Sequence, residues 1–296
     1  MQTSYLQYMI EIDRTRSITQ AAANLYMTQP SLSRILHEIE AQLGFALFER
    51  SNRGVRPTAA GVAFLQHARR ILNEMEAIEN LGNSRQAAER FYICMPRSAG
   101  ILNMAADYLS TLPPGQPLDA VLRECHVRQA FDFIDSGEAD VAVIRFRSEY
   151  QDYFQDQASV RGLTFRELSG FLYRVVLRRD NPLAGKARLT LQDLAGLTEI
   201  SHGDTFRTRR QESEASSRRI YSVDRHAQLA LLQRLPDTFM WLTPTPPEEL
   251  DARGLVQRDV ADNRIQYKNA LITLSPGLLN EIERGFVDYV DKRSRT

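Results

Sequence analysis

The stretch SITQAAANLYMTQPSLSRILHEIEAQ, from Ser17 to Gln42, contains two signals for the start of a helix. Ser17 can cap a first helix through its side-chain oxygen, and Gln20 stands where a capping box has its second member. Thr28 can cap a second helix, and Pro30 falls in the first turn of that helix, where a missing N–H costs no hydrogen bond. The stretch therefore predicts two helices joined by a short turn.

The second predicted helix has an apolar and a polar face. Its apolar side chains, at helical spacing, are Leu32, Ile35, Leu36, Ile39 and Leu43. Its short or hydrogen-bonding side chains are Gln29, Ser31, Ser33, Arg34 and His37. With an amphipathic helix over residues 5–12, this is the layout of a helix-turn-helix, whose second helix enters the DNA major groove. A helical subdomain with a solvated polar face is the alternative.

The segment FALFERSNRGVRPTAAG, which follows Gly44, predicts a small β-wing. Its apolar residues Phe45, Leu47 and Phe48 are expected to return the chain to the core. Asn52 to Gly54 is a turn signal. The three arginines expected to point outward are Arg50, Arg53 and Arg56. Between residues 28 and 56 four arginines stand against three glutamates, so a basic face depends on how the fold gathers them.

The whole chain gives no hint of a polyanionic partner, because 37 Lys and Arg balance 37 Asp and Glu over 296 residues. The length favours two or three folding units. Two cysteines are too few for a disulfide framework and fit a reducing compartment. The N-terminal segment does not read as a signal peptide, and no apolar run is long enough for a membrane span. We therefore expect a soluble, cytoplasmic protein without a membrane partner.

A long helix is expected after Thr58, which is a good N-cap. Its apolar residues recur at alternating four- and three-residue steps, as in a coiled-coil seam: Phe64, Ala68, Ile71, Met75 and Ile78. The seam predicts pairing with a second copy of the chain, and packing of the helix on its own domain is the alternative. Residues 81–89 are interpreted as the hinge into the second half.

The second half alternates short apolar runs with helical stretches, which favours an α/β sheet with buried parallel strands. The predicted strands cover residues 91–96, 118–125, 139–146, 170–179, 197–201, 219–223, 238–244 and 267–274. The predicted helices cover residues 99–112, 129–137, 190–197 and 227–235, with a last helix starting at Ser275-Pro276.

The first sixty residues resemble the N-terminal winged helix-turn-helix of LysR-type transcriptional regulators. The matching positions are Ser17, Ala21, Ala22, Leu25, Gln29-Pro30, Ser33, Ile39-Glu40, Leu43-Gly44, Leu47-Phe48, Arg50, Thr58 and Gly61. Ile18 stands where the family usually has phenylalanine, and Pro57 where an apolar residue is commoner. The resemblance implies that Gln29, Ser31, Ser33, Arg34 and His37 face base edges and nearby phosphates, and that Arg50, Arg53 and Arg56 hold the DNA backbone.

The second half resembles the effector-binding part of the same family, two α/β lobes like those of periplasmic solute-binding proteins. Three segments carry this resemblance: 137–140 (GEAD), 181–184 (NPLA) and 241–244 (WLTP). The implied domains are a DNA-binding domain over 1–60, a dimerisation helix and hinge over 61–89, and an effector domain over 90–296. Its first lobe would cover about 90–165 and 265–296, and its second about 166–264. The resemblance also implies a homodimer or homotetramer acting on double-stranded DNA, with RNA polymerase as a further candidate partner.

In such a fold the ligand binds between the lobes, at loops that follow the strands. The residues at those positions are Arg97, Ser98, Ala99, Arg145, Phe146, Ser201, His202, Thr205, Trp241 and Thr243. Hydroxyls, helix-start N–H groups and an arginine suit a carboxylate, which favours an anionic small molecule as effector. That these are ordinary loop residues is the alternative. The arginine-rich run over 206–221 is interpreted as a solvated surface, with contact to flanking DNA or a partner subunit as the alternative.

No pattern for catalysis, cofactor binding or metal binding is found. Cys125 and His126 are adjacent, but neighbours on a strand point to opposite faces, so we expect no Cys–His pair. The five histidines show no metal-ligand spacing, and no phosphate loop or nucleophile elbow occurs. We therefore expect no enzyme, no cofactor and no metal. The serious alternative to an effector-controlled regulator is a DNA-binding regulator whose α/β half only oligomerises.

Overall fold

The computed structural model describes residues 2–51, 54–81, 88–202 and 216–294. The chain divides into two compact units. Unit 1 comprises residues 1–97, 101–168 and 269–296, and unit 2 comprises residues 98–100 and 169–268. Among the described residues no helix is both long and apolar enough to cross a membrane.

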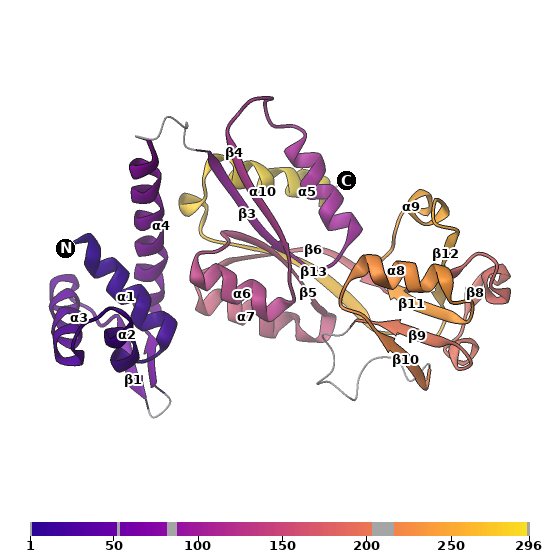
Figure 1. Ribbon diagram of the computed structural model, residues 1–296, viewed down its shortest axis with the longest axis horizontal. Helices are drawn as coiled ribbons and strands as arrows, with labels where there is room; N and C mark the ends of the chain where they lie inside the picture. The colour runs from indigo at the N-terminus through magenta and orange to yellow at the C-terminus, as the bar shows by residue number, and fades with distance from the viewer. Residues whose placement is uncertain (1, 52–53, 82–87, 203–215, 295–296) are drawn as a thin grey trace. The chain divides into compact units, whose positions relative to one another are not determined.

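The N-terminal part of unit 1 is a winged helix-turn-helix (Figure 1). Three helices, α1 (Thr3–Thr15), α2 (Ile18–Asn24) and α3 (Gln29–Leu43), precede the wing. The wing is an antiparallel pair, β1 (Phe48–Ser51) and β2 (Gly54–Pro57). Its core is built from fully buried side chains contributed by all three helices and the approach to the wing, among them Met9, Ile12, Ala21, Leu32, Ile39 and Leu47.

The helix starts follow the caps expected from the sequence, with one difference. The hydroxyl of Ser17 accepts a hydrogen bond from the backbone N–H of Gln20 at 3.3 Å, and that of Thr28 accepts one from Ser31 at 3.4 Å. The Gln20 side chain does not reach back to complete a capping box; it donates to Asn24 one turn later, at 2.9 Å.

The segment after α3 differs from expectation at Phe45. Its side chain is 41% exposed, while Leu47 and Phe48 are buried, so two and not three apolar residues return the chain to the core. The cause is local: α3 ends at Leu43, and the next residue, Gly44, turns the chain sharply with a φ of 79° and leaves Phe45 outside.

The long helix α4 (Ala59–Leu81) begins as the sequence predicts. Thr58 caps it by accepting a hydrogen bond from the N–H of Gly61 at 2.9 Å. A Cβ at residue 61 would lie 1.9 Å from the carbonyl oxygen of Leu47, so only glycine allows the helix start to approach the wing so closely.

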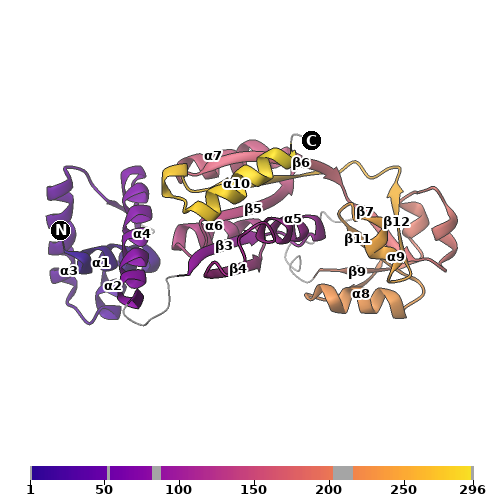
Figure 2. The same ribbon diagram turned by 90° about the horizontal axis from the view of Figure 1, so that it is seen from above.

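The remainder of unit 1 is an α/β sandwich. Its sheet has the order β4-β3-β5-β13-β6, made of β3 (Glu89–Met95), β4 (Leu118–Glu124), β5 (Val141–Arg147), β6 (Thr164–Leu172) and β13 (Gln266–Thr273). The helices α5 (Ala99–Leu109) and α10 (Glu281–Ser294) lie on one side, and α6 (Val127–Ser136) and α7 (Gln151–Val160) on the other (Figures 1 and 2). Aromatic contacts fill both interfaces, such as Phe91 with Phe286 and Phe131 with Phe154.

Unit 2 contains a second sheet with the order β10-β9-β11-β7-β12-β8. Its strands are β7 (Arg174–Arg178), β8 (Arg188–Leu189), β9 (Thr198–Ser201), β10 (Arg218–Tyr221), β11 (Thr238–Leu242) and β12 (Leu255–Val260). The helices α8 (Arg225–Arg234) and α9 (Pro247–Asp251) contribute Leu232 and Leu250 to one core cluster. Short 3-10 turns at Pro182–Gly185 and Gln192–Leu194 contribute Ala184 and Leu194 to another.

Several expected elements of the second half are corrected. The sheet of unit 2 is mixed rather than parallel, because β7 pairs antiparallel with both β11 and β12. The strand predicted over residues 170–179 is two strands separated at Tyr173, and each belongs to a different sheet. The helix expected over 190–197 is only a 3-10 turn. The last helix starts not at Ser275 but after Asn280. The side-chain oxygen of Asn280 caps this helix by accepting a hydrogen bond from the N–H of Glu283 at 3.0 Å.

Candidate nucleic-acid interface and effector-binding residues

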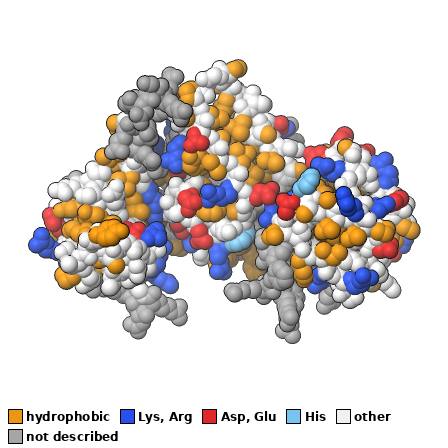
Figure 3. Space-filling model, in the orientation of Figure 1, with side chains coloured by type: hydrophobic (Ala, Val, Ile, Leu, Met, Phe, Trp, Pro, Cys, Tyr) orange, Lys and Arg blue, Asp and Glu red, His pale blue; other side chains and the backbone are white. Residues whose placement is uncertain are grey.

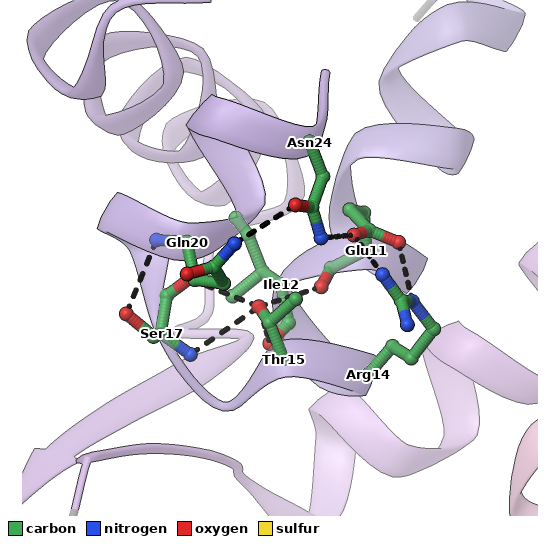
Figure 4. A network of polar contacts seen from close by, with 7 residues as sticks. All are labelled: Glu11, Ile12, Arg14, Thr15, Ser17, Gln20 and Asn24. Carbon is green, nitrogen blue, oxygen red and sulfur yellow. Dashed lines mark hydrogen bonds and ion pairs between the residues drawn. The ribbon is translucent and has the colours of Figure 1, made fainter. Parts of the chain in front are cut away.

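A polar network at the junction of α1 and α2 sets the entry to the helix-turn-helix (Figure 4). Glu11 accepts hydrogen bonds from Arg14 at 2.6 Å and from Asn24 at 2.6 Å, so it joins the end of α1 to the end of α2. The Thr15 hydroxyl donates to the carbonyl of Ser17 at 2.9 Å and holds the connection between the two helices. These contacts fix the orientation of α2, on which α3 packs.

The first turns of α3 present the polar side chains that the sequence singled out. Gln29 donates to the hydroxyl of Ser33 at 2.8 Å, and the hydroxyls of Thr28 and Ser31 are hydrogen-bonded at 2.8 Å. The apolar residues on the opposite face, Leu32, Leu36 and Ile39, are buried in the domain core. The helix therefore packs through one face and exposes hydrogen-bonding groups along the other.

Arg34 and His37 extend this exposed face toward the C-terminus of α3. Nδ1 of His37 lies 3.7 Å from a carboxylate oxygen of Glu40. The other oxygen of Glu40 accepts the backbone N–H groups of Leu47 at 2.7 Å and Phe48 at 3.2 Å. Glu40 thus ties the end of α3 to the wing.

The wing is described only in part. Arg56 is exposed on β2, Arg53 lies outside the described residues, and the side chain of Arg50 is not described. The N–H of Val55 donates to the carbonyl of Arg16 at 2.9 Å, which anchors the wing to the end of α1.

Tyr26, in the turn between α2 and α3, is a surface residue that the sequence analysis did not consider for binding. Its side chain is 98% exposed and its backbone has a positive φ of 54°. A fully exposed aromatic residue in a strained turn next to α3 is a candidate contact residue. The signal in the sequence is weak, because tyrosine is not a usual turn residue but carries no motif of its own.

The helix α4 is tied to the helix-turn-helix by a nearly buried ion pair. Arg69 contacts Asp13 of α1 at 2.6 Å, and the two side chains are 12% and 8% exposed. Of the predicted dimerisation residues, Phe64 packs against the domain core and Ala68 is buried within the single chain. Ile71, Met75 and Ile78 are exposed, so the C-terminal half of the helix keeps an uncovered apolar stripe.

Charge is mixed over the face shown in Figure 3, where Lys and Arg side chains alternate with Asp and Glu. That face shows no extended basic field. That face therefore offers no broad basic surface to a polyanion.

Three adjacent strands of unit 1 gather the polar residues expected near an effector. Arg145 on β5 donates to Oδ1 of Asn269 on β13 at 3.0 Å and to the carbonyl of Arg97, which follows β3, at 3.0 Å. Arg97 in turn forms an ion pair with Glu124 at 3.2 Å. Asn269 is buried and was missed from the sequence, because its neighbour on β5 is known only once the strand order is known.

Phe146 does not join this group. Its side chain is 4% exposed and packs against Phe154 and Phe165, with ring centroids 5.1 and 6.1 Å away. Successive side chains of a strand point to opposite faces, so Arg145 and Phe146 cannot share one site. Phe146 is a core residue, and we leave it out of the proposed site. Ser98 precedes α5, and Ala99 begins that helix.

In unit 2 the expected residues follow the neighbouring strands β9 and β11. The side chain of the buried Gln228 donates to the carbonyl of Ser201 at 3.3 Å and to that of Ser222 at 2.7 Å, and a ring nitrogen of His202 lies 3.2 Å from the Ser222 carbonyl. Thr243 is buried. Thr205 lies outside the described residues, as does most of the arginine-rich run.

Trp241 is half-buried on β11, and its ring packs edge-on against Phe239. Its indole N–H is buried and has no hydrogen-bond partner among the described residues. A buried donor of this kind usually has a partner, so the indole is suited to an acceptor atom of a ligand.

The expected placement of Cys125 and His126 on one strand is wrong. Strand β4 ends at Glu124, so Cys125 and His126 are not neighbours on a strand. Instead His126 caps α6, where its ring accepts the N–H of Gln129 at 3.4 Å. Among the described residues no group of three or more His, Cys, Asp or Glu is placed to hold a metal ion.

Comparison with known families assigns both halves of the chain. Residues 3–62 match the bacterial regulatory helix-turn-helix protein model of the lysR family, and residues 118–295 match the LysR substrate binding domain. The chain therefore belongs to the LysR family and combines a helix-turn-helix domain with a substrate-binding domain of that family.

Individual relatives agree with this assignment. The hydrogen peroxide-inducible genes activator of Dickeya chrysanthemi is 26% identical over 199 residues, which cover 64% of this chain and 60% of that protein. The match thus spans less than two thirds of the relative. Full-length LysG from Corynebacterium glutamicum, solved with bound effector Arg, has a TM-score of 0.58 at 15% identity, covering 100% of this chain and 98% of that one. A full-length OxyR variant from Pseudomonas aeruginosa has a TM-score of 0.52 at 17% identity, covering 100% and 95%. These two structures share the fold.

Proposed function

We propose that this protein is a sequence-specific regulator of transcription that binds double-stranded DNA as a homodimer or homotetramer in the cytoplasm. The observation that carries the proposal is α3: its apolar face is buried, and its first turns expose Ser31 and Arg34 beside the half-buried Gln29 and Ser33. Hydroxyl, amide and guanidinium groups are the side chains that read base edges in the major groove. His37, Arg50, Arg53 and Arg56 complete the proposed DNA contacts, and Tyr26 is added to them.

Pairing of two chains through the exposed stripe of α4 would set two copies of α3 against one face of the duplex. Such dimers recognise inverted repeats whose half-sites are separated by whole helical turns. RNA polymerase is the partner through which bound protein would alter transcription.

The test is selection of bound duplexes from a random pool with the full-length protein, followed by affinity measurements at two salt concentrations. We expect an enriched inverted repeat whose affinity falls steeply with salt, because arginines displace ions from phosphates. Failure of folded protein to enrich any motif would contradict the proposal.

For the α/β half we propose that Arg97, Ser98, Ala99, Arg145, Ser201, His202, Thr205, Trp241 and Thr243 bind a small anionic effector. Support comes from Arg97 and Arg145, which meet at adjacent strand ends, and from the unpartnered Trp241 indole. Two guanidinium groups and N–H donors are the usual means of binding a carboxylate. One observation favours the alternative, in which the α/β half only oligomerises. Both arginines already have polar partners within the chain, because Glu124 pairs with Arg97 and Asn269 accepts a hydrogen bond from Arg145.

Thermal denaturation with a panel of amino acids, dicarboxylates and aromatic carboxylates separates these two functions. An effector regulator is stabilised by at least one compound, and Arg145→Met loses that stabilisation while Arg128→Met, an exposed position on α6, keeps it. Equal stabilisation of both variants would remove Arg145 from the site. No stabilisation by any compound in the panel would favour the oligomerising role.

A further inference from the structure

The two cysteines of the chain lie on neighbouring strands of the unit 1 sheet. β3 pairs in parallel with β4, and Cys94 stands opposite Arg123 in the register. Cys125 follows two residues after Arg123, and its N–H continues the ladder by donating to the carbonyl of Met95 at 2.9 Å. Cys125 lies beyond the last residue of β4, but this hydrogen bond continues the strand pairing by one residue, so Cys125 projects to the same side as Cys94 and Arg123. The two thiols are near enough for each to shift the pKa of the other.

Their surroundings distinguish the two sulfurs. Cys94 is 2% exposed, whereas Cys125 is half-buried just beyond the end of β4, the edge strand of the sheet. The hydrogen bond from Cys125 lowers the pKa of Cys94, with the positive charge of Arg123 adding to the effect. The same hydrogen bond and burial raise the pKa of Cys125. Cys94 is therefore the more readily ionised thiol and the better nucleophile, and Cys125 is the more exposed of the two.

Cys94 belongs to the apolar core of unit 1 and Cys125 packs against that core, but one charged side chain, Arg123, lies on the same side of the sheet. Arg123 forms an ion pair with Glu138 at 2.8 Å and lies over the ring of Phe133 at 4.4 Å. These contacts hold the guanidinium near enough for its positive charge to lower the pKa of both thiols. A cation next to a thiolate is the usual feature of a reactive cysteine.

We propose that Cys94 and Cys125 form a redox site that a hydroperoxide oxidises to an intramolecular disulfide and that a small thiol reduces again. The Cys94 thiolate attacks the peroxide; the O–O bond breaks, one oxygen leaves as alcohol or water, and Cys94 becomes a sulfenic acid. Cys125 then attacks that sulfur, the S–S bond forms, and the second oxygen leaves as water. The two thiols lose two electrons and the peroxide gains them. In reduction, two molecules of a thiol such as glutathione become one disulfide.

Closing the bond requires the sulfurs to approach to about 2.05 Å, closer than any hydrogen bond. Cys125 can move toward Cys94 because it lies just beyond Glu124, the last residue of β4. The pair of Glu124 with Arg97 would move with it. A change in effector binding through Arg97 would rest on the proposed function. The thiol chemistry does not rest on it, and the experiment that tests this chemistry uses neither DNA nor effector.

The experiment treats reduced full-length protein with hydrogen peroxide and then with an alkylating agent, and measures the intact mass. We expect loss of two hydrogens, no remaining alkylation, a crosslinked peptide pair containing Cys94 and Cys125, and full recovery with dithiothreitol. Two free thiols after treatment would overturn the proposal. So would a mass gain of two or three oxygens, a disulfide between chains, or reaction only after unfolding in urea.

The order of the steps is tested with Cys125→Ser and Cys94→Ser, each checked for folding by circular dichroism. In Cys125→Ser the serine hydroxyl can still donate to Cys94, so dimedone should trap a sulfenic acid at Cys94. In Cys94→Ser we expect Cys125 to react at least about tenfold more slowly, because its thiolate is disfavoured. Equal rates would contradict the assignment of Cys94 as the attacking sulfur. The mass measurement on the wild-type protein tests for the disulfide even if neither variant folds.

Discussion

At the scale of single residues, the side chains of α3 that pack into the domain core are different from those that can contact DNA. Leu32 and Ile39 are fully buried, whereas Arg34 is exposed one helical turn from Ser31. A substitution at Arg34 therefore removes a guanidinium without opening a cavity, so DNA binding can change while the fold does not.

We predict that Arg34→Ala lowers affinity for the selected duplex at least about tenfold, since a good base contact contributes about 1–3 kcal/mol. The melting temperature should stay within the error of the wild type. Affinity is measured by fluorescence anisotropy, with Arg128→Ala as the control because it removes the same charge from an exposed site in the α/β part. Equal affinities of the two variants would exclude Arg34 from the interface.

A second prediction concerns the buried carboxyl groups of Asp140 and Glu283. The two carboxyl groups influence each other's ionisation; Asp140 is half-buried, whereas Glu283 is 1% exposed and accepts the N–H of Asn280 at 2.9 Å. Burial and the charge of Asp140 raise the pKa of Glu283 to about 8 from 4.5. The folded protein thus holds a proton that the unfolded chain releases, and stability falls as pH rises from 4.5 through 8.

Glu283→Gln keeps a neutral side chain at every pH, so it should lose this part of the pH dependence. We expect the free energy of unfolding of the wild type, relative to the variant, to fall by up to about 1.4 kcal/mol per pH unit in that window. Urea denaturation at several pH values measures the difference. A constant difference from pH 5 to 8 would mean that Glu283 is ionised throughout.

At the scale of elements, the link between α1 and α4 makes the DNA-binding part and the start of the linker one rigid piece. The ion pair between Asp13 and Arg69 is almost buried, unlike that between Glu11 and Arg14, where Arg14 is 64% exposed. Removing Arg69 takes one of two guanidinium groups from the buried Asp13, whose other partner is Arg16 at 2.6 Å, whereas an exposed pair contributes little.

Arg69→Met should therefore lower the free energy of unfolding by about 2 kcal/mol, because Asp13 keeps Arg16 as a partner. Its matched control, Arg14→Met, should lower it by less than about 1 kcal/mol. Chemical denaturation of the full-length protein gives both values. Similar losses in the two variants would show that the Asp13 pair does not hold the helices together.

The elements also show what the sequence could and could not predict. Capping residues and helical spacing predicted α2, α3, the wing and the start of α4, because these depend on neighbours in the chain. The antiparallel pairing of β7 and the contact of Asn269 with Arg145 depend on strand order, which local patterns do not encode. Cys94 and Cys125 were likewise found in separate predicted strands, and only the register brings them together. Phe146 was misassigned because a strand end exposes only alternate residues.

At the scale of the whole molecule, the exposed stripe of Ile71, Met75 and Ile78 on α4 is the proposed contact between two chains. Ile78 is 63% exposed, so a charged residue there costs the single chain little. We predict that Ile78→Glu weakens self-association at least about tenfold, because a pair of chains would bury the charge. Sedimentation across a range of concentrations measures it, with Val160→Glu, an exposed apolar position on α7, as the control. Unchanged association of Ile78→Glu would exclude this stripe.

The central claim is that α3 reads the major groove of an inverted repeat, and methylation interference on the selected duplex tests it most directly. Methyl groups on guanine N7 lie in the major groove, and those on adenine N3 in the minor groove. We predict that N7 methylation in both half-sites blocks binding, and that Arg34→Ala loses sensitivity at one guanine in each half-site. Interference confined to adenine N3, or to one half-site only, would contradict the account.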